Sequence, residues 1–297
     1  MVATGMGQAS QFYLHRDKVE QEIARSMLSF GEKTKLRDAC EYALKSGGKR
    51  YRPLLVLLIA EALAKGQDVL DAAMSVEFFH TASLVVDDLP CMDNEEERRS
   101  SPTVHKIYGE SIALLASYSL ICAAFEKIHH NAEKVRDARV GMVALAEAAR
   151  AAGIVGAVGG QFYDLFPPSL SLEALREVIY KKTVTLFEVS FVFGWLFGGG
   201  DPALLERVKR AAYHFGMAFQ IADDLVDLAQ DEKNEREVNL ARHIGKERAL
   251  VVFEEELKAL RVLLAVLGLD TLSFRKMVEM LRAHALRGFK SNLPQTL

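Results

Sequence analysis

Two acidic clusters, each placed directly after an apolar run, constrain this chain more than any other feature. The first lies in LVVDDLPCMDNEEERRSSPT at residues 84–103, and the second lies in FQIADDLVDLAQDEK at residues 219–233. Their aspartates are Asp87, Asp88, Asp93, Asp223, Asp224 and Asp227. Ionised carboxylates leave water only when they are paired or hold a cation. The carboxylates of each cluster must therefore face solvent or share a charge with a partner. The two clusters are far apart in the chain, so only folding can bring them together.

The spacing of the second cluster suits one face of a helix. Each residue of an α-helix turns by about 100°, so Asp223 and Asp227 lie one above the other with Asp224 on the flank. Like charges at this spacing repel each other, and the helix gains nothing from them without a cation. Mg²⁺ prefers hard oxygen ligands and typically takes one or two carboxylates together with phosphate oxygens and waters. The second cluster therefore predicts part of a magnesium site.

The first cluster needs a break in its helix to form a similar pair. Asp93 lies six residues after Asp87 and points elsewhere on a straight helix. Pro90 lacks an N–H and clashes with the carbonyl of Val86, so the helix can end or bend there. We expect this break to return Asp93 to the side of Asp87.

The simplest alternative is that both clusters are solvated helix ends, as a single DDxxD would favour. Here each cluster follows an apolar segment that we expect to be buried, and Arg98 and Arg99 follow the first cluster. An EF-hand calcium loop is a poor alternative, because neither cluster has the alternating oxygen ligands, the sixth-position glycine and the twelfth-position glutamate. The residues favour a shared metal and diphosphate site.

Five segments resemble motifs of the all-trans prenyl diphosphate synthases, short-chain type, in the order of that family. DDLPCMDNEEERRSSPTVH is similar to the first aspartate-rich motif with its paired arginines, and FQIADDLVD is similar to the second. GGKRYRP at residues 47–53 resembles the motif for the homoallylic substrate, and GGQFYDL and KKTVTLF lie between the two aspartate-rich motifs. The resemblance runs from about residue 40 to about residue 250.

The resemblance implies an all-α fold of the isoprenoid synthase type. It predicts one domain over residues 1–297, a bundle of about ten or more helices around a deep apolar cavity. The periodicity of the chain agrees, and no run alternates convincingly as a strand. We expect helices over residues 13–30, 36–45, 54–64, 70–86, 104–128, 135–158, 172–197 and 204–228, and two or three more from residue 249 onward.

The same resemblance assigns roles to individual residues. The metal ligands that it implies for Mg²⁺ are Asp87, Asp93, Asp223 and Asp227. The catalytic residues are Asp87, Asp93, Arg98, Lys182 and Asp223. The substrate-binding residues are Lys49, Arg52, His80, Arg98, Arg99, Lys182, Thr183, Gln220 and Lys246. Asp88 and Asp224 are expected to act on the metal ligands without binding the metal themselves. Gln161 and Asp164 are expected to form a polar pair beneath the site.

The implied reaction is the condensation of isopentenyl diphosphate with an allylic diphosphate of the dimethylallyl, geranyl or farnesyl type. Metal-assisted ionisation of the allylic substrate precedes attack by the double bond of isopentenyl diphosphate. The product is farnesyl or geranylgeranyl diphosphate. A regulatory subunit without turnover is an alternative. A class I terpene cyclase is a weaker one, because a cyclase does not need GGKRYRP, His80 or Arg99.

Three positions depart from the family pattern or bear on product length. Ser117-Tyr118 stands where the family usually has Gly-Asp, and the expected Gly-Lys loop after Asp231 is missing, so Lys233 or Lys246 would have to replace its lysine. Ala82, five residues before Asp87, is small, which in the family favours a product of farnesyl length or longer. The bulkier residues that could still close the cavity are Phe78, Phe79 and Tyr118.

Composition sets the remaining expectations. With 297 residues, 50% hydrophobic residues and a net charge of −3, the chain is typical of a globular protein and lacks the basic excess of a nucleic-acid surface. Its three cysteines have no metal-binding spacing, which favours reduced thiols in the cytoplasm. We expect no membrane span, because no run reaches the roughly 18 apolar residues required. We also expect a homodimer, with residues 112–125 as either an interface or a core helix.

Overall fold

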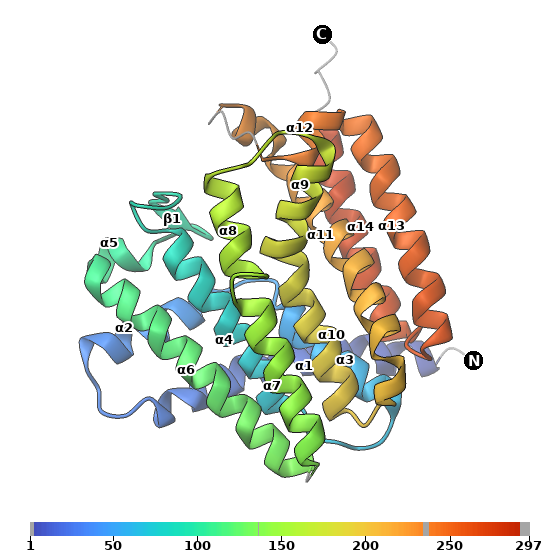
Figure 1. The fold of residues 1–297 in the computed structure, drawn as a ribbon. Helices are drawn as coiled ribbons and strands as arrows, with labels where there is room; N and C mark the ends of the chain where they lie inside the picture. Colours follow the sequence, from blue (N-terminus) through green and yellow to red (C-terminus); the bar gives the residue numbers. More distant parts are fainter. Residues whose placement is uncertain (1–2, 136, 234–237, 292–297) are drawn as a thin grey trace. The chain divides into compact units, whose positions relative to one another are not determined.

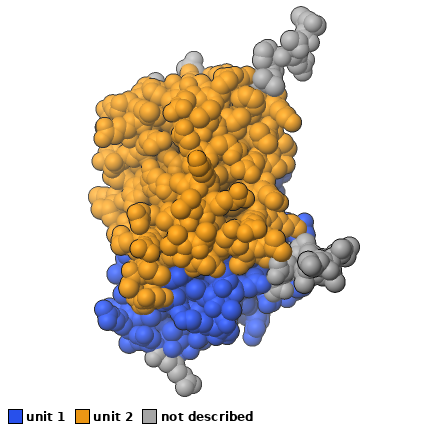
Figure 2. Space-filling view, turned by 90° about the vertical axis from the view of Figure 1, so that its right-hand side faces the viewer, with its two compact units in different colours: residues 1–148, 192–200 blue, residues 149–191, 201–297 orange. Residues whose placement is uncertain are grey.

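The computed structural model describes residues 3–135, 137–233 and 238–291 and is all-α, as predicted (Figure 1). The chain forms two compact units, which Figure 2 distinguishes by colour. Unit 1 consists of Met1–Ala148 and Val192–Gly200, and unit 2 consists of Ala149–Phe191 and Asp201–Leu297. The first acidic cluster belongs to unit 1 and the second to unit 2.

Unit 1 is built around two buried helices. Its elements are α1 (Ala3–Ser26), η1 (Met27–Ser29), α2 (Lys35–Lys45), α3 (Tyr51–Leu63), α4 (Leu70–Asp87), β1 (Glu97–Arg98), β2 (Ser101–Pro102), α5 (Val104–Tyr108), α6 (Glu110–Val135) and most of α7 (Ala138–Ala152). The sequence of α3, YRPLLVLLIAEAL, has no polar face, so this helix is buried almost all round. α4 packs against both α3 and α6, and it carries the first cluster at its C-terminal end.

Two expectations for unit 1 were wrong in detail. A two-residue antiparallel pair, β1 with β2, follows the first cluster, although no strand was predicted. The helix expected over residues 104–128 is divided at Gly109, whose φ of +87° is unfavourable for any other residue. The chain therefore turns between α5 and α6.

Unit 2 is centred on the long helix α11. Its elements are α8 (Ala157–Leu165), α9 (Leu172–Ile179), the π-helical η2 (Tyr180–Val184), the first part of α10 (Thr185–Phe197), η3 (Pro202–Leu204), α11 (Leu205–Lys233), α12 (Leu240–Ile244), α13 (Lys246–Val266) and α14 (Leu272–Ser291). α11 lies beside α13 and α14, as Figure 1 shows. Fully buried phenylalanines from α10, α11 and α14, namely Phe191, Phe215 and Phe274, contact one another.

α11 and α14 approach each other at a glycine. A Cβ on Gly288 would lie 2.6 Å from the backbone nitrogen of Val226, which is closer than real Cβ atoms come. Only glycine therefore allows the two backbones to pack at this distance. This contact fixes α14 against the stretch of α11 that carries the second cluster.

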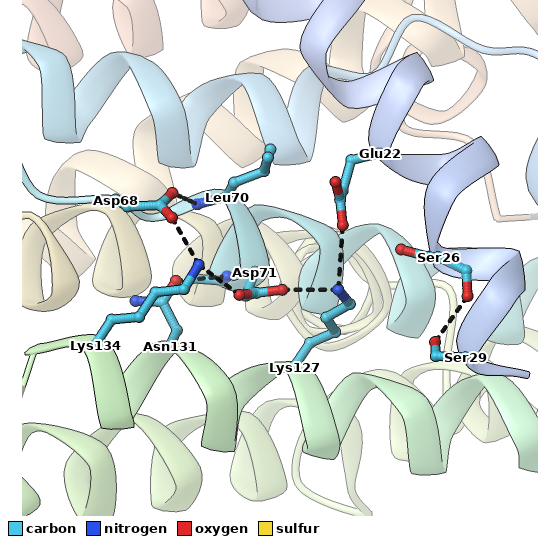
Figure 3. Close-up of polar contacts among 10 residues, drawn as sticks. Glu22, Ser26, Ser29, Asp68, Leu70, Asp71, Lys127, Asn131 and Lys134 are labelled. Atoms are coloured by element: carbon cyan, nitrogen blue, oxygen red, sulfur yellow. Dashed lines mark hydrogen bonds and ion pairs between the residues drawn. The ribbon is translucent and has the colours of Figure 1, made fainter.

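Ion pairs fix the start of α4 in unit 1 (Figure 3). Lys127 of α6 lies 2.7 Å from Asp71 and 3.4 Å from Glu22 of α1. Lys134, two turns further along α6, lies 2.6 Å from Asp68 and 2.7 Å from Asp71. Burial alone would raise the pKa of Asp71, but the hydrogen bonds from both lysines outweigh it and lower that pKa. These pairs hold together α1, α4 and α6.

Two stretches of the described chain are long and apolar enough to meet the composition of a membrane span, so the expectation of none is not confirmed. They are Glu110–Val135 and Ala138–Leu165, in which 33% and 22% of the apolar window is buried. The second stretch is interrupted between α7 and α8, where the helix expected over residues 135–158 stops at Ala152. A core helix of a globular protein passes the same test, so composition alone is weak support for a membrane.

Candidate active site

The backbone of the first cluster folds back on itself at the end of α4. The helix ends at Asp87, and the chain then turns so that the backbone N–H of Asp93 donates to the carbonyl of Asp87 over 2.8 Å. Asn94 has a φ of +51°, which closes this turn. The expected return of Asp93 to Asp87 is therefore confirmed at the level of the backbone.

Asp88, the residue after the predicted metal ligand Asp87, forms an ion pair with the side chain of Arg98. The Nε of Arg98 donates to Oδ1 of Asp88 over 2.7 Å, and Asp88 is buried. Burial lowers the pKa of Arg98, but the hydrogen bond and charge of Asp88 outweigh it and raise the pKa. This pair holds Arg98 in one orientation. It is consistent with the prediction that Asp88 does not bind the metal itself.

The GGKR segment positions Arg99. A guanidinium N–H of Arg99 donates to the carbonyl of Gly47, and a Cβ on Gly48 would lie 2.6 Å from the Cζ of Arg99. Gly48 also has a φ of +127°, which only glycine adopts without strain. The two glycines therefore provide a flat backbone surface under the Arg99 side chain.

The basic residues of this segment divide into two roles. Arg50 is buried, and its guanidinium donates to Glu77, to Glu20 and to the carbonyl of Leu44. A buried arginine with these partners joins α1, α2 and α4 and is a structural residue. Lys49 beside it is exposed to solvent and so remains accessible to an anion.

His80 lies on α4 among the arginines of unit 1. Its Nε2 is 3.4 Å from Nη1 of Arg52. Burial, followed by the charges of Arg52, Arg99, Arg98 and Arg50, holds the pKa of His80 well below its usual range. His80 is therefore neutral at neutral pH, and its Nε2 accepts a hydrogen bond from Arg52. The structure thus brings His80, Arg52 and Arg99 together in unit 1, as predicted.

Four of the predicted site residues of unit 2, Lys182, Thr183, Gln220 and Asp227, line one pocket of about 110 Å³, whereas Asp223 and Lys246 do not. Its polar lining includes Asp164, Lys182, Thr183, Gln220, Asp224 and Asp227. These residues come from α8, η2 and α11, which are separated in sequence. The convergence of Lys182, Thr183, Gln220 and Asp227 on one pocket agrees with the sites predicted from the sequence.

A π-helical turn and a glycine place Lys182 at this pocket. Tyr180–Val184 forms five residues of π-helix, the kind of local irregularity that is frequent at functional sites. A Cβ on Gly160 of α8 would overlap the backbone of Lys182, so α8 can approach η2 only at a glycine. The Nζ of Lys182 then pairs with Oδ2 of Asp164. This ion pair holds the lysine side chain at the pocket.

A chain of hydrogen bonds connects η2 to the second cluster. The hydroxyl of Thr183 donates to Oε1 of Gln220 over 2.7 Å, and Nε2 of Gln220 donates to Oδ1 of Asp224 over 2.8 Å. The N–H of Leu240 donates to the other oxygen of Asp224 over 2.8 Å. Burial raises the pKa of Asp224 to about 7. Both oxygens of Asp224 therefore accept hydrogen bonds at the edge of the pocket, and its role in supporting the metal ligands stays a prediction.

The two predicted ligands of the second cluster lie one turn apart on α11. Asp227 lines the pocket, while Oδ1 of Asp223 lies 2.7 Å from Nε2 of His284 on α14. His284 has no counterpart in the sequence-based site. A single histidine in an amphipathic C-terminal segment carries no signal, because its contact depends on the packing of α14.

The lysines expected to replace the Gly-Lys loop are not gathered at the pocket. Lys233 ends α11, and residues 234–237 lie outside the described chain. Lys246 begins α13, where its Nζ lies 5.9 Å from the ring centre of Phe289. Lys246 is not among the described residues that line the pocket, so its role as a substrate ligand stays a prediction.

The helix face below the first cluster is closely packed. The hydroxyl of Ser117 on α6 donates to the carbonyl of Ala82 on α4 over 2.9 Å. Tyr118 beside it is 57% exposed, and its effect on product length stays a prediction. Phe78 and Phe79 are buried.

The carboxylates of each cluster suit Mg²⁺ without forming a complete cage. No group of three or more histidine, cysteine, aspartate or glutamate side chains in the described residues is arranged to hold a metal ion. Each cluster instead has two predicted ligand carboxylates that are close in the chain and not fully buried. Mg²⁺ typically keeps several waters and binds one or two carboxylates plus substrate phosphates. The donor set fits that mode of binding.

Comparisons with known proteins point in the same direction. Residues 33–239 match the family described as polyprenyl synthetase. A chloroplastic geranylgeranyl pyrophosphate synthase of Capsicum annuum is 42% identical over 202 residues, covering 67% of this chain and 54% of that protein. The large subunit 1 of a heterodimeric geranylgeranyl pyrophosphate synthase of Arabidopsis thaliana is 39% identical over 217 residues, covering 70% of this chain and 58% of that protein. The chain thus spans less than two thirds of both relatives.

Solved structures are similar along nearly the whole chain. A geranyltransferase from Legionella pneumophila has a TM-score of 0.84 and 26% identity, covering 98% of this chain and 100% of that one. A geranyltransferase from Helicobacter pylori, in complex with magnesium and isoprenyl diphosphate, has a TM-score of 0.80 and 26% identity, covering 93% and 98%.

Proposed function

Because this chain belongs to the polyprenyl synthetase family, we propose that it is a short-chain prenyltransferase. It would condense isopentenyl diphosphate with an allylic diphosphate of the dimethylallyl, geranyl or farnesyl type. The observation that carries the proposal is the pocket of unit 2, where Lys182, Thr183 and Gln220 meet Asp227. A fixed cation beside a carboxylate that suits Mg²⁺ is the arrangement needed to bind a diphosphate.

In this proposal the two aspartate clusters act on one diphosphate. Asp87 and Asp93 of unit 1 and Asp223 and Asp227 of unit 2 would hold Mg²⁺ against the allylic diphosphate. The bound metal supplies Lewis-acid stabilisation of the leaving diphosphate.

Fixed cations of the chain stabilise the charge that grows on the leaving diphosphate. Arg98 and Lys182 are each held by a carboxylate, Asp88 and Asp164 respectively, and so need not reorganise during the reaction. Such preorganised cations stabilise the transition state more than the ground state, because the negative charge of the diphosphate increases as the C–O bond breaks.

The second substrate would bind at the basic surface of unit 1. Lys49, Arg52 and Arg99 offer donors to the diphosphate of isopentenyl diphosphate. His80 is neutral and accepts from Arg52, which fixes the orientation of that guanidinium. Two diphosphate sites distinguish this function from that of a cyclase, which binds one.

We favour geranylgeranyl diphosphate as the main product, with farnesyl diphosphate as the alternative. Ala82 and Ser117, which are in contact across α4 and α6, are both small, and in the family bulk near Ala82 tends to stop chain growth early. The relative from Capsicum annuum carries the name of a geranylgeranyl pyrophosphate synthase.

One incubation tests the proposed function. The purified chain is supplied with Mg²⁺, labelled isopentenyl diphosphate and each allylic primer in turn, with Asp87→Ala as the inactive control. Elongated linear diphosphates support the proposal. Hydrocarbons would indicate a cyclase. Absence of turnover at any primer would indicate a regulatory subunit and contradict the proposal.

A second copy of the chain is the proposed partner, through an apolar face of unit 1. Leu114, Leu115 and Tyr118 on α6 and Met142 on α7 are exposed, and exposed apolar clusters commonly mark interfaces. Sedimentation velocity should give a dimer for the wild type and a monomer for Leu115→Glu, with the exposed Glu126→Gln as control. A monomeric wild type, or a dimer that survives Leu115→Glu, would overturn this assignment. The large subunit from Arabidopsis thaliana is named as heterodimeric, so a related chain is the alternative partner.

The cytoplasm remains the proposed compartment. All three cysteines are free thiols, and burial raises the pKa of Cys40 to about 11. Reduced cysteines are typical of a reducing compartment. Microscopy of the tagged protein should show a diffuse cytoplasmic signal, and an organellar or membrane signal would contradict the proposal.

A further inference from the structure

We propose that His284 on α14 is a positioning residue for Asp223, and that its hydrogen bond sets the orientation of this metal-binding carboxylate. The inference rests on the proposed function, because it assigns a role to a residue that acts through a ligand of Mg²⁺. It goes beyond that function because His284 lies outside every motif that the sequence suggested.

The contact between the two side chains is direct and largely sheltered. Nε2 of His284 lies 2.7 Å from Oδ1 of Asp223, and the two side chains are 12% and 29% exposed. A hydrogen bond of this length to a carboxylate restricts rotation of its two oxygens. His284 comes from α14 and Asp223 from α11, so the contact exists only when these two helices are packed.

A neighbouring arginine selects the tautomer of the histidine. Nη2 of Arg287 lies 3.4 Å from Nδ1 of His284. A guanidinium has no acceptor, so Nδ1 must accept from Arg287. The ring hydrogen of a neutral His284 is therefore on Nε2, from which it is donated to Asp223. Fixing one ring nitrogen so that the other donates in a known direction is a common way to hold a metal-binding group in place.

The backbone beneath His284 is fixed as well. Gly288 lies one helical turn after His284, and a Cβ there would lie 2.6 Å from the backbone nitrogen of Val226. The two helices therefore cannot slide apart or rotate without losing their closest contact. The position of His284 relative to Asp223 is set by the backbone and does not depend on a flexible side chain alone.

The consequence for metal binding follows from the geometry of a carboxylate. The hydrogen bond from His284 holds Oδ1 of Asp223 and so restricts the directions in which this carboxylate, one turn from Asp227 on the same helix, can present its oxygens to a cation. Partners behind metal ligands commonly change metal affinity by about 10–100-fold when removed. His284 should therefore affect how tightly the second cluster binds a cation, even in the absence of turnover.

The test measures metal binding without catalysis. The probe is Mn²⁺ in the presence of inorganic pyrophosphate, and free Mn²⁺ is followed by its electron paramagnetic resonance signal. His284→Leu removes the donor and should weaken Mn²⁺ binding by about tenfold or more. His284→Gln keeps an N–H donor at a similar reach and should remain within about threefold of the wild type. His243→Leu, at an exposed histidine of unit 2, is the matched control and should leave binding unchanged.

A second readout separates positioning from general damage to the fold. In steady-state assays His284→Leu should raise the Mg²⁺ concentration needed for half-maximal rate more than it lowers kcat at saturating Mg²⁺. Thermal unfolding of each variant is recorded in parallel. If His284→Leu does not fold, Arg287→Leu tests the same idea, because it frees the tautomer and should weaken Mn²⁺ binding to a smaller extent.

Failure of this inference and failure of the proposed function give different results in the Mn²⁺ measurement. Mn²⁺ binding by His284→Leu equal to that of the wild type would overturn the inference while leaving the proposed function intact. Equal weakening by His284→Leu and His284→Gln would also overturn it, because the donor would then be irrelevant. A wild type that binds no Mn²⁺ with pyrophosphate would instead contradict the proposed function, and with it the metal site that the inference concerns.

Discussion

Both acidic clusters contain an Asp-Asp pair, and the second aspartate of the pair has a charged partner in one cluster and neutral partners in the other. In the first cluster Asp88 pairs with the guanidinium of Arg98. In the second cluster Asp224 is buried, accepts hydrogen bonds from the neutral donors of Gln220 and Leu240, and has its pKa raised by burial to about 7. An ion pair favours a charged carboxylate, whereas burial favours a protonated one, and at Asp224 burial outweighs the opposing effect of the two N–H donors.

The same Asp-Asp sequence therefore has two different structural roles in this chain. In unit 1 the flanking aspartate, Asp88, orients the guanidinium of Arg98. In unit 2 the flanking aspartate, Asp224, accepts from the N–H of Leu240, the first residue of α12. This bond holds the chain that follows α11 close to the second cluster. The helices that present the clusters also differ. α4 is fixed at its start by ion pairs, and α11 is fixed by close backbone contact with α14.

Loss of a metal ligand should have the largest effect, and it should be equal in the two units. Asp87→Asn and Asp223→Asn each remove a charged oxygen from one cluster, and kcat/KM should fall by on the order of 10³-fold in both. Steady-state kinetics with saturating isopentenyl diphosphate measure this, with the exposed Glu279→Gln as control. Retention of activity within tenfold by either variant would show that only one cluster serves catalysis.

Gly288→Ala should lower the stability of the fold more than substitution of any of the aspartates. The added methyl group would meet the backbone of Val226 at 2.6 Å, so α14 must move away from α11. Overpacking of this kind costs about 2–3 kcal/mol, which lowers Tm by roughly 5–10 °C. Differential scanning calorimetry checks the shift, and the exposed Lys290→Ala on the same helix is the control. An unchanged Tm would mean that α14 is not anchored at this glycine.

The flanking aspartates should respond to the same substitution in different ways. Asp88→Asn removes the charge that orients Arg98, so KM for the allylic substrate should rise by about tenfold with little change in Tm. Asp224→Asn presents an amide to one of two N–H donors, so it should lower the free energy of unfolding by about 1–2 kcal/mol with a smaller change in KM. Kinetics and urea unfolding of both variants measure the pattern.

If both variants changed KM alone, or both changed stability alone, the contrast between the two clusters would be disproved. The result would then favour a single role for the second aspartate in each unit.

The smallest expected effect concerns pH and the ion pairs at the start of α4. The lysines lower the folded-state pKa of Asp71 below its ordinary value of 3.8. Its contribution to stability is thus present above about pH 4 and is lost as the pH falls through the folded-state pKa. Asp71→Asn should reduce stability at pH 6 by about 1 kcal/mol, and should flatten the loss of stability between pH 4 and pH 3. Thermal melts across this range test the sign, and an equally steep loss in Asp71→Asn would refute the assignment.

The sequence alone could predict the features that depend on local chemistry. The apolar run of α3, the end of α4 before Pro90 and the return of Asp93 follow from residue types that are adjacent in the chain. The spacing of Asp223 and Asp227 likewise follows from the pitch of a helix. These elements were predicted because each depends on few neighbours.

The remaining features depend on contacts between distant segments. Arg50 and Lys49 are adjacent basic residues, and only the positions of Glu20 and Glu77 decide that Arg50 is buried. The π-helical turn at Lys182 depends on the approach of α8, which no local pattern reveals. The same is true of His284, whose contact with Asp223 follows from the packing of α14.

The central claim of the proposed function is that both aspartate clusters take part in binding the same diphosphate, and a binding cycle tests it most directly. Isothermal titration calorimetry with Mg²⁺ and an unreactive allylic analogue, farnesyl diphosphate with sulfur in place of the bridging oxygen, is applied to the wild type, Asp87→Asn, Asp223→Asn and the double variant. We predict one analogue per chain, weaker binding in both single variants, and a loss in the double variant that is smaller than the product of the two single losses. Losses that multiply independently, or a single variant that binds as tightly as the wild type, would contradict the claim.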